Sequence, residues 1–278
     1  MTKTILVTGC SSGLGRTTAL AFAAAGWNVV ATMRRPDQMP EGSFPPGVLV
    51  LPLDVTDPHS ASAAIEVAVR HFGALDAVVN NAGVSILSIF ETTPIDAVRR
   101  VFDANVFGAM NVTRAAIPAL RQSHGVIVNV SSGVGFVAVP LLSLYVASKH
   151  ALEGFSESVA YELESQHIRV RLVEPGAMRT TAFSANTVEA TGSAPVPDGY
   201  RVYFDHALGA MMNYPFPDTS EQSVVDAILT AANDTTTRLR YPVGPDVVEY
   251  ARLRWTTSED EYAARMSGLV GQTAWREN

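Results

Sequence analysis

Three patterns follow one another in residues 1–26 and limit the folds that are open to this chain. Residues 4–8 (Thr-Ile-Leu-Val-Thr) are apolar and β-branched, which is typical of a strand buried on both faces. A glycine-rich turn, Thr8-Gly-x-x-x-Gly-x-Gly15, comes next. Residues 16–25 are alanine-rich and amphipathic, and the predicted helix ends at Gly26. A strand, a glycine turn and a helix in this order provide the context that a dinucleotide fingerprint needs.

The glycine turn predicts a contact with a pyrophosphate. Glycines let the backbone approach phosphate oxygens closely, and a helix N-terminus offers free N–H groups and the positive end of its dipole. A glycine motif alone is weak evidence, but the flanking strand and helix favour a nucleotide. We therefore expect cofactor contacts from this turn, at Gly9, Ser11, Ser12, Gly13, Leu14 and Gly15.

Strand-like and helix-like patterns alternate along most of the chain. Strands are expected at residues 4–8, 27–32, 48–53, 75–79, 125–130 and 168–173. Helices are expected at 16–25, 59–72, 94–121 (one long helix or two in succession), 142–165 and 220–232. This alternation implies right-handed βαβ units and a parallel sheet, with ligands beyond the carboxyl ends of the strands. The expected fold is an α/β, Rossmann-like, doubly wound parallel sheet in a single domain, with its core in 1–182 and 220–245.

The end of the second strand carries information on the cofactor. NAD sites usually place an acidic residue there to hold the ribose 2′-hydroxyl, whereas an arginine accommodates the 2′-phosphate of NADP. Here Thr32 and Met33 end the strand, and Arg34 and Arg35 follow. The sequence therefore favours NADP (NADPH), with Arg34 as the phosphate contact. The alternative is that these arginines form a solvated basic turn.

A second chemical pattern is Tyr145-Val-Ala-Ser-Lys149, with Ser132 thirteen residues before the tyrosine. On a helix, side chains four residues apart share a face, so Tyr145 and Lys149 should lie side by side. An ammonium near a phenol lowers the phenol's pKa, which helps proton exchange with an alcohol or ketone. Ser132 follows the strand at 125–130 and could hydrogen-bond the same oxygen. By itself, however, such a pair also arises by chance on helix surfaces.

Composition excludes several other classes of protein. The chain of 278 residues is 47% apolar and 17% charged, which indicates a compact protein with a large core. A net charge of −7 and scattered basic residues give no support for nucleic-acid binding. The single cysteine, Cys10, favours a reducing compartment. With neither a leader pattern nor a long apolar run, a cytoplasmic protein without a membrane span is expected. No cluster of metal ligands is visible, so a metal-free mechanism is expected.

Together these residues resemble the short-chain dehydrogenase/reductase family, in its smaller single-domain branch. Seven motifs match in the family's order and span roughly residues 4–180, so the resemblance depends on their combination. The matching segments are Thr8-Gly-x-x-x-Gly-x-Gly15, Asp54-Val55, Asn80-Asn-Ala-Gly83, Asn105, Ser132, Tyr145-x-x-x-Lys149, and Pro175-Gly176 with Thr180.

The resemblance implies a role for each matching residue. Tyr145 would donate the proton in reduction, Lys149 would lower its pKa and hold the nicotinamide ribose, and Ser132 would polarise the substrate carbonyl. Asn105 would hold a water in a proton relay, although an asparagine in an apolar stretch by itself favours a structural role. The remaining implied cofactor contacts are Asp54, Val55, Asn81, Ala82, Gly83, Pro175, Gly176 and Thr180. Helices holding Asn105 and Tyr145 form dimer interfaces in relatives, so a homodimer or homotetramer is expected.

The C-terminal third departs from the shortest family members. Residues 184–220 read as a long irregular stretch that contains Tyr200, Tyr203, Phe204, Met211, Met212, Tyr214 and Phe216. Long irregular segments are uncommon unless they form lids or binding segments, so a substrate lid with an apolar lining is expected here. Alternatively, these side chains pack a C-terminal subdomain. Residues 246–278 form an extension whose use the sequence does not indicate.

The sequence thus predicts an NADP(H)-dependent oxidoreductase that interconverts a ketone or aldehyde and an alcohol, with a bulky hydrophobic substrate. One alternative is a non-catalytic NADPH sensor on the same fold; the intact set of Ser132, Tyr145 and Lys149 argues against it. Another is an epimerase or a dehalogenase-like lyase on the same scaffold, and the intact glycine pattern argues against that. Fold alone does not decide function.

Overall fold

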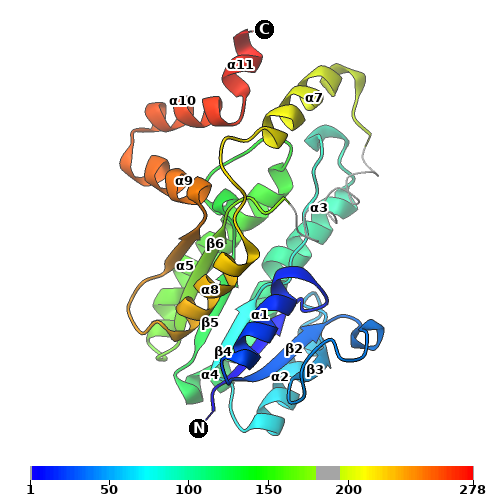
Figure 1. The fold of residues 1–278 in the computed structure, drawn as a ribbon, viewed down its shortest axis with the longest axis vertical. Helices are drawn as coiled ribbons and strands as arrows, with labels where there is room; N and C mark the ends of the chain where they lie inside the picture. Colours follow the sequence, from blue (N-terminus) through cyan, green and yellow to red (C-terminus); the bar gives the residue numbers. More distant parts are fainter. Residues whose placement is uncertain (1, 180–194, 278) are drawn as a thin grey trace.

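A computed structural model describes residues 2–179 and 195–277. The described chain forms one seven-stranded sheet in the order β3-β2-β1-β4-β5-β6-β7, and all six strand pairs are parallel (Figure 1). This arrangement confirms the predicted Rossmann-like α/β fold. The strands are β1 (Thr4–Thr8), β2 (Asn28–Met33), β3 (Leu49–Pro52), β4 (Ala77–Asn80), β5 (Val126–Val130), β6 (Arg169–Pro175) and β7 (Arg240–Val243).

Helices cover both faces of the sheet. On one face α1 and α8 bury Phe22, Val224 and Ile228 against the strands. On the other face α2, α4 and α5 bury Ile65, Leu120 and other apolar residues. The helices are α1 (Gly13–Ala24), α2 (Pro58–Phe72), α3 (Ile95–Phe102), α4 (Gly108–Ser123), α5 (Ser143–Glu164), α7 (Asp198–Met212), α8 (Glu221–Asn233), α9 (Pro245–Thr256), α10 (Glu259–Leu269) and α11 (Gln272–Glu277).

One predicted stretch is confirmed in one of its two forms, and another differs from the prediction. Residues 94–121, predicted as one long helix or two in succession, form α3 and α4 joined by the π-helical turn η3 (Asp103–Phe107), which contains Asn105. The stretch 184–220 was expected to be irregular, but its described part contains the 15-residue helix α7. That prediction was wrong for α7, because the run of turn-forming residues that suggested a loop lies before and after the helix. The beginning of this stretch, residues 184–194, lies outside the described residues.

The strand order reverses between β1 and β4, which are neighbours in the sheet. Asn81, just after β4, ties the two strand ends together: its Nδ2 donates to the carbonyl of Thr8 at 2.9 Å, and its N–H donates to the Thr8 hydroxyl at 3.0 Å. Ligands of open α/β sheets bind at such a switch point, beyond the carboxyl ends of the strands. The topology therefore places the predicted motif loops at one edge.

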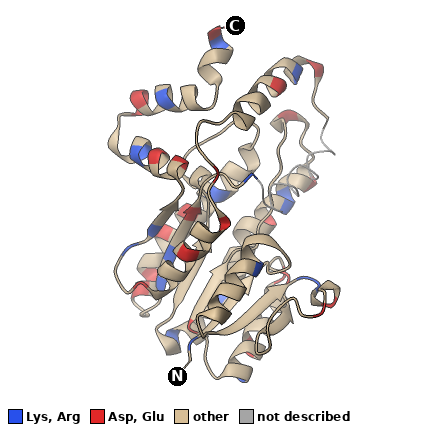
Figure 2. Cartoon of the chain, viewed as in Figure 1, with Lys and Arg blue, Asp and Glu red and all other residues tan. Residues whose placement is uncertain are grey.

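Charge is distributed unevenly between the elements. Strands β1 to β5 carry no charged residue, and Figure 2 shows residues of both signs spread over the outer helices instead. Strands β6 and β7 are different, because they contain Arg169, Arg171, Glu174 and Arg240. In the described part of the chain, no helix combines the length and the hydropathy that crossing a membrane would need.

Candidate active site

A cavity of about 850 Å³ opens at the carboxyl edge of the sheet, where the structure brings most of the predicted site residues together. It runs from the glycine turn to α7 and α9. The predicted residues that line it are Gly9, Ser11, Ser12, Gly13, Leu14, Gly15, Arg34, Asp54, Val55, Asn81, Ala82, Gly83, Ser132, Tyr145, Lys149, Pro175 and Gly176. Thr180 lies outside the described residues. Asn105 lies directly behind the cavity wall, next to the lining residue Ala104.

The glycine turn forms a cradle in which Gly9 and Gly15 present no side chain. Gly9 has a left-handed φ of +74°, and a Cβ on Gly15 would overlap the carbonyl of Gly9 and the amide of Asn81. Helix α1 begins at Gly13, with no acidic residue in its first turn and no side-chain cap at Ser12. Its first N–H groups are therefore free to meet an anion, which fits the pyrophosphate of a dinucleotide.

The far end of the cavity is formed by the ends of β2 and β3. Met33 and the exposed Arg34 follow β2, and Asp54 and Val55 follow β3. The Asp54 carboxylate accepts hydrogen bonds from the N–H and the hydroxyl of Thr56, at 2.9 and 2.8 Å, which fix the loop after β3. A guanidinium in this position suits a phosphate group.

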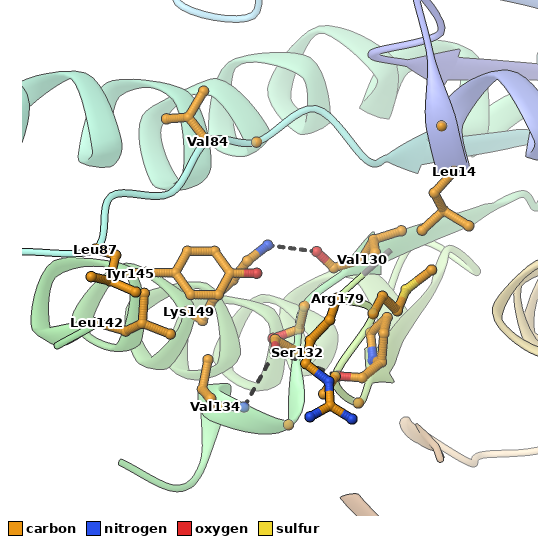
Figure 3. Close-up of a pocket in the computed structure, with 18 of the residues that line it drawn as sticks. Leu14, Val84, Leu87, Val130, Ser132, Val134, Leu142, Tyr145, Lys149 and Arg179 are labelled. Carbon is orange, nitrogen blue, oxygen red and sulfur yellow. Dashed lines mark hydrogen bonds between the residues drawn. The ribbon is translucent and has the colours of Figure 1, made fainter. Parts of the chain in front are cut away.

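Tyr145, Ser132 and Lys149 meet in the middle of the cavity (Figure 3). The Ser132 hydroxyl hydrogen-bonds the phenol of Tyr145 and also accepts from the N–H of Val134 at 3.3 Å. Lys149 runs beside the tyrosine ring, with its Nζ 5.6 Å from the ring centroid, and donates to the carbonyl of Val130 at 2.8 Å. Helix α5 supplies the tyrosine and the lysine, while the segment after β5 supplies the serine.

The electrostatics of this group differ from the sequence-based expectation. Burial raises the pKa of Tyr145 above its usual value, and the hydrogen bond from Ser132 opposes the rise. Burial lowers the pKa of Lys149 to about 8, against the attraction of Glu153. The expectation that Lys149 brings the phenol pKa below its ordinary value was wrong for this structure, because burial outweighs the hydrogen bond from Ser132, which opposes the rise. Tyr145 consequently keeps its proton at neutral pH, as a proton donor must.

Asn105 is 2% exposed, and its side-chain amide is bound by protein groups. Its Oδ1 accepts from the N–H of Val84 at 2.8 Å, and its Nδ2 donates to the Val84 carbonyl and the Ser148 hydroxyl, both at 2.9 Å. These bonds join the loop after β4 to η3 and α5. These hydrogen bonds match the structural role that an asparagine in an apolar stretch suggested. The role of Asn105 in a proton relay stays a prediction.

Sequence reasoning missed part of the cavity wall. Leu208 of α7, Asp246 and Tyr250 of α9, and Val270 after α10 all line it, so the C-terminal extension closes the cavity together with α7. Figure 3 shows Leu87, Val134 and Leu142 near Tyr145. Arg179 also lines the cavity, and its guanidinium pairs with Asp218. No local motif marks these residues, because their place depends on how distant helices pack. The nearest sequence signal was the Gly244-Pro245 turn, which precedes Asp246 at the start of α9.

Comparisons with known proteins agree with this geometry. A family model described as short chain dehydrogenase matches residues 3–191. An uncharacterized oxidoreductase of Schizosaccharomyces pombe is 35% identical over 244 residues, covering 86% of this chain and 100% of that protein. A solved short-chain dehydrogenase from Streptomyces avermitilis matches with a TM-score of 0.78 and 30% identity, covering 100% of this chain and 97% of that chain. Another, from Burkholderia cenocepacia in complex with NADP, has a TM-score of 0.72 and 26% identity, covering 90% and 92%.

The fold and the cavity define a Rossmann-like α/β protein with a dinucleotide cradle next to a tyrosine, a serine and a lysine. The family model covers well over half of the 278 residues, and the relatives are oxidoreductases. The chain belongs to the short-chain dehydrogenase/reductase family and is an oxidoreductase that uses a nicotinamide cofactor.

Proposed function

We propose that this protein is an NADP(H)-dependent oxidoreductase that interconverts a ketone or aldehyde and an alcohol, with Tyr145 as proton donor and acceptor. The observation that carries the proposal is the group formed by Tyr145, Ser132 and Lys149, in the same cavity as the glycine cradle. The proposal also places the protein in the cytoplasm as a homodimer or homotetramer, in one domain in which the segment 184–220 acts as a substrate lid.

The chain's own residues explain how a carbonyl would be handled. The hydroxyls of Ser132 and Tyr145 are hydrogen-bonded to each other, so both reach an oxygen placed between them. Tyr145 delivers its proton to that oxygen as negative charge develops there, and the ammonium of Lys149 stabilises the phenolate that remains. When bound, the reduced nicotinamide supplies the hydride for the carbonyl carbon. The apolar side chains of Leu87, Val134 and Leu142 exclude water around the reacting group.

A direct experiment offers NADPH and NADH, each against a panel of aldehydes, small ketones, long-chain ketones and steroid ketones, with absorbance of the reduced nicotinamide as the readout. Consumption of NADPH with a carbonyl supports the proposal. Tight binding of NADPH without turnover of any carbonyl or alcohol would instead favour a sensor, and turnover without net oxidation or reduction would favour an epimerase or lyase.

Replacing Arg34 tests the cofactor preference. We expect Arg34→Ala to raise the KM for NADPH by about tenfold or more and to leave the KM for NADH nearly unchanged, because a charge-assisted hydrogen bond to phosphate contributes about 1.5–3 kcal/mol. Steady-state kinetics with both cofactors measure this. Arg35→Ala is the matched control, since Arg35 does not line the cavity. Equal losses with both cofactors would contradict a phosphate contact at Arg34.

The apolar wall predicts how substrate size affects the rate. In a homologous series of methyl ketones, kcat/KM should rise by about three- to fourfold for each methylene that the cavity buries, because each contributes about 0.8 kcal/mol. In the variant Leu142→Asn, kcat/KM should increase less with ketone chain length, because Leu142 lines the cavity next to Tyr145. Val202→Asn, at a position 71% exposed on α7, should leave it unchanged. If kcat/KM of the native protein did not change with ketone chain length, the proposal of a hydrophobic substrate would be contradicted.

A further inference from the structure

Three charged side chains are packed together directly behind the candidate active site. Glu153 of α5 is 4% exposed and Glu174 of β6 is fully buried. Arg240, the first residue of β7, reaches both of them with the same nitrogen: its Nη1 pairs with Glu153 and lies 2.8 Å from Oε1 of Glu174. Burying two carboxylates beside one guanidinium has a desolvation cost, which suggests that the arrangement serves a function.

The arginine of this cluster is fixed from two sides. Its guanidinium lies over the ring of Trp255 on α9, at 5.5 Å from the centroid. Its Nη2 lies 3.4 Å from Oε2 of Glu157, which is one turn beyond Glu153 on α5 and has a side chain 55% exposed. Arg240 therefore has one carboxylate partner at the surface, Glu157, and two in the interior, Glu153 and Glu174.

The Glu153 side chain also abuts the loop that carries the catalytic serine. A Cβ built on Gly135 would lie 2.7 Å from the Ser131 hydroxyl and 2.9 Å from Oε1 of Glu153, so Gly135 is needed for the carboxylate to fit there. Ser131 immediately precedes Ser132, and Lys149 precedes Glu153 by one helical turn on the same face of α5. Glu153 thus lies next to Ser131 and one helical turn from Lys149, whose ammonium it attracts.

One of the two carboxyl groups holds a proton at neutral pH. Burial and the neighbouring Glu153 raise the pKa of Glu174 to about 8, and Glu174 hydrogen-bonds Glu153. Burial raises the pKa of Glu153 as well, but Ser131, Arg240 and Lys149 all oppose that rise, so Glu153 is the group favoured as the anion and Glu174 the neutral donor. The charged groups that face Glu153 are Lys149 and Glu157 from α5, Glu174 from β6 and Arg240 from β7, while η4 (Gly133–Gly135) contributes none.

We propose that Glu153 is a positioning residue that keeps the buried Lys149 protonated, and that Glu174 and Arg240 hold Glu153 in place as the anion. The proposal rests on the proposed function, in which the Lys149 ammonium acts beside Tyr145. Burial lowers the pKa of Lys149, and the negative charge of Glu153 opposes that decrease. No sequence motif of the site includes Glu153.

The chain offers an unusually clean test, because Lys3 and Lys149 are its only lysines. Protein labelled with lysine carrying ¹³C at Cε gives two resonances, and Lys3→Arg assigns them. The pH titration of the Lys149 resonance is then recorded for the native chain, for Glu153→Gln and for Glu157→Gln. The control variant Glu157→Gln removes a carboxylate from the same helix and from the same arginine, but at the surface.

Removal of the Glu153 charge should make Lys149 lose its proton more easily. In the native chain the midpoint should lie near pH 8. In Glu153→Gln it should fall by about one pH unit or more, because the opposite charge favours the ammonium. Glu157→Gln should titrate as the native chain does. An unchanged midpoint in folded Glu153→Gln overturns the proposal.

If Glu153→Gln fails to fold, Glu153→Asp decides the question. The shorter side chain draws the carboxylate away from Lys149, so the midpoint should fall by a smaller amount, and a native midpoint overturns the proposal. Because the titration needs neither cofactor nor substrate, its outcome is separate from that of the proposed function. Where a carbonyl substrate is found, the alkaline fall of kcat/KM should move to lower pH in Glu153→Gln and stay in place in Glu157→Gln.

Discussion

Tyr145→Phe is expected to lower kcat for carbonyl reduction by about a thousandfold, within the range that a positioned general acid contributes. Phenylalanine keeps the ring that packs beside Lys149 but removes the hydroxyl that Ser132 hydrogen-bonds. Burial raises the pKa of this phenol, so at neutral pH the residue is present as the acid that reduction requires. The dissociation constant for NADPH should change by less than about threefold, because the glycine cradle is unaffected.

A matched control for this variant lies on the same helix. Tyr161 is 75% exposed on α5, and Tyr161→Phe should retain native kcat and native cofactor binding. Single-turnover rates and fluorescence titration with NADPH separate chemistry from binding. If Tyr145→Phe kept more than about a tenth of the native kcat, the phenol would not be the proton donor.

Gly15→Ala is expected to abolish measurable NADPH binding, with affinity reduced by about a hundredfold or more. A Cβ at this position would overlap the carbonyl of Gly9 and the amide of Asn81, both held by the ends of β1 and β4. The turn must shift to relieve the overlap, and the N–H groups at the start of α1 then lose their alignment toward a pyrophosphate. Overpacking of this kind also destabilises the fold by about 1–3 kcal/mol.

Gly154→Ala is the matched control, since nothing lies within 4 Å of a Cβ at Gly154 in the middle of α5. That variant should bind NADPH normally and should be more stable by about 0.5–1 kcal/mol, because alanine restricts the unfolded chain. Isothermal titration and chemical denaturation measure both quantities. Native NADPH affinity in Gly15→Ala would contradict a cradle at this turn.

The parts of the site that follow the strand ends could be predicted from the sequence. In a parallel sheet all carboxyl ends lie at one edge, so Gly9, Asn81 and Ser132 had to meet once their strands were recognised. Helical spacing placed Tyr145 and Lys149 together in the same way. Local pattern and sheet topology were sufficient for these residues.

The remaining features depend on contacts between distant segments. Arg240 pairs with Glu153 across 87 residues, and the sequence placed Glu174 only at the start of the loop that follows the strand predicted at 168–173. The pKa of Tyr145 depends on the burial of its side chain, which no local pattern reveals. Helix α7 was hidden because glycine and proline at its borders resemble loop composition. Such features require the packed structure.

The most direct test of the central claim follows an isotope from cofactor to product. NADPH carrying deuterium at C4 of the nicotinamide is incubated with the protein and with the best carbonyl of the panel, and the product is analysed by mass spectrometry. Reduction by the proposed route predicts one deuterium on the carbinol carbon of the alcohol, from one face of the nicotinamide only. With Tyr145→Phe the labelled product should form about a thousandfold more slowly. An alcohol without the label, or NADPH that binds while every carbonyl remains unreduced, would contradict the account.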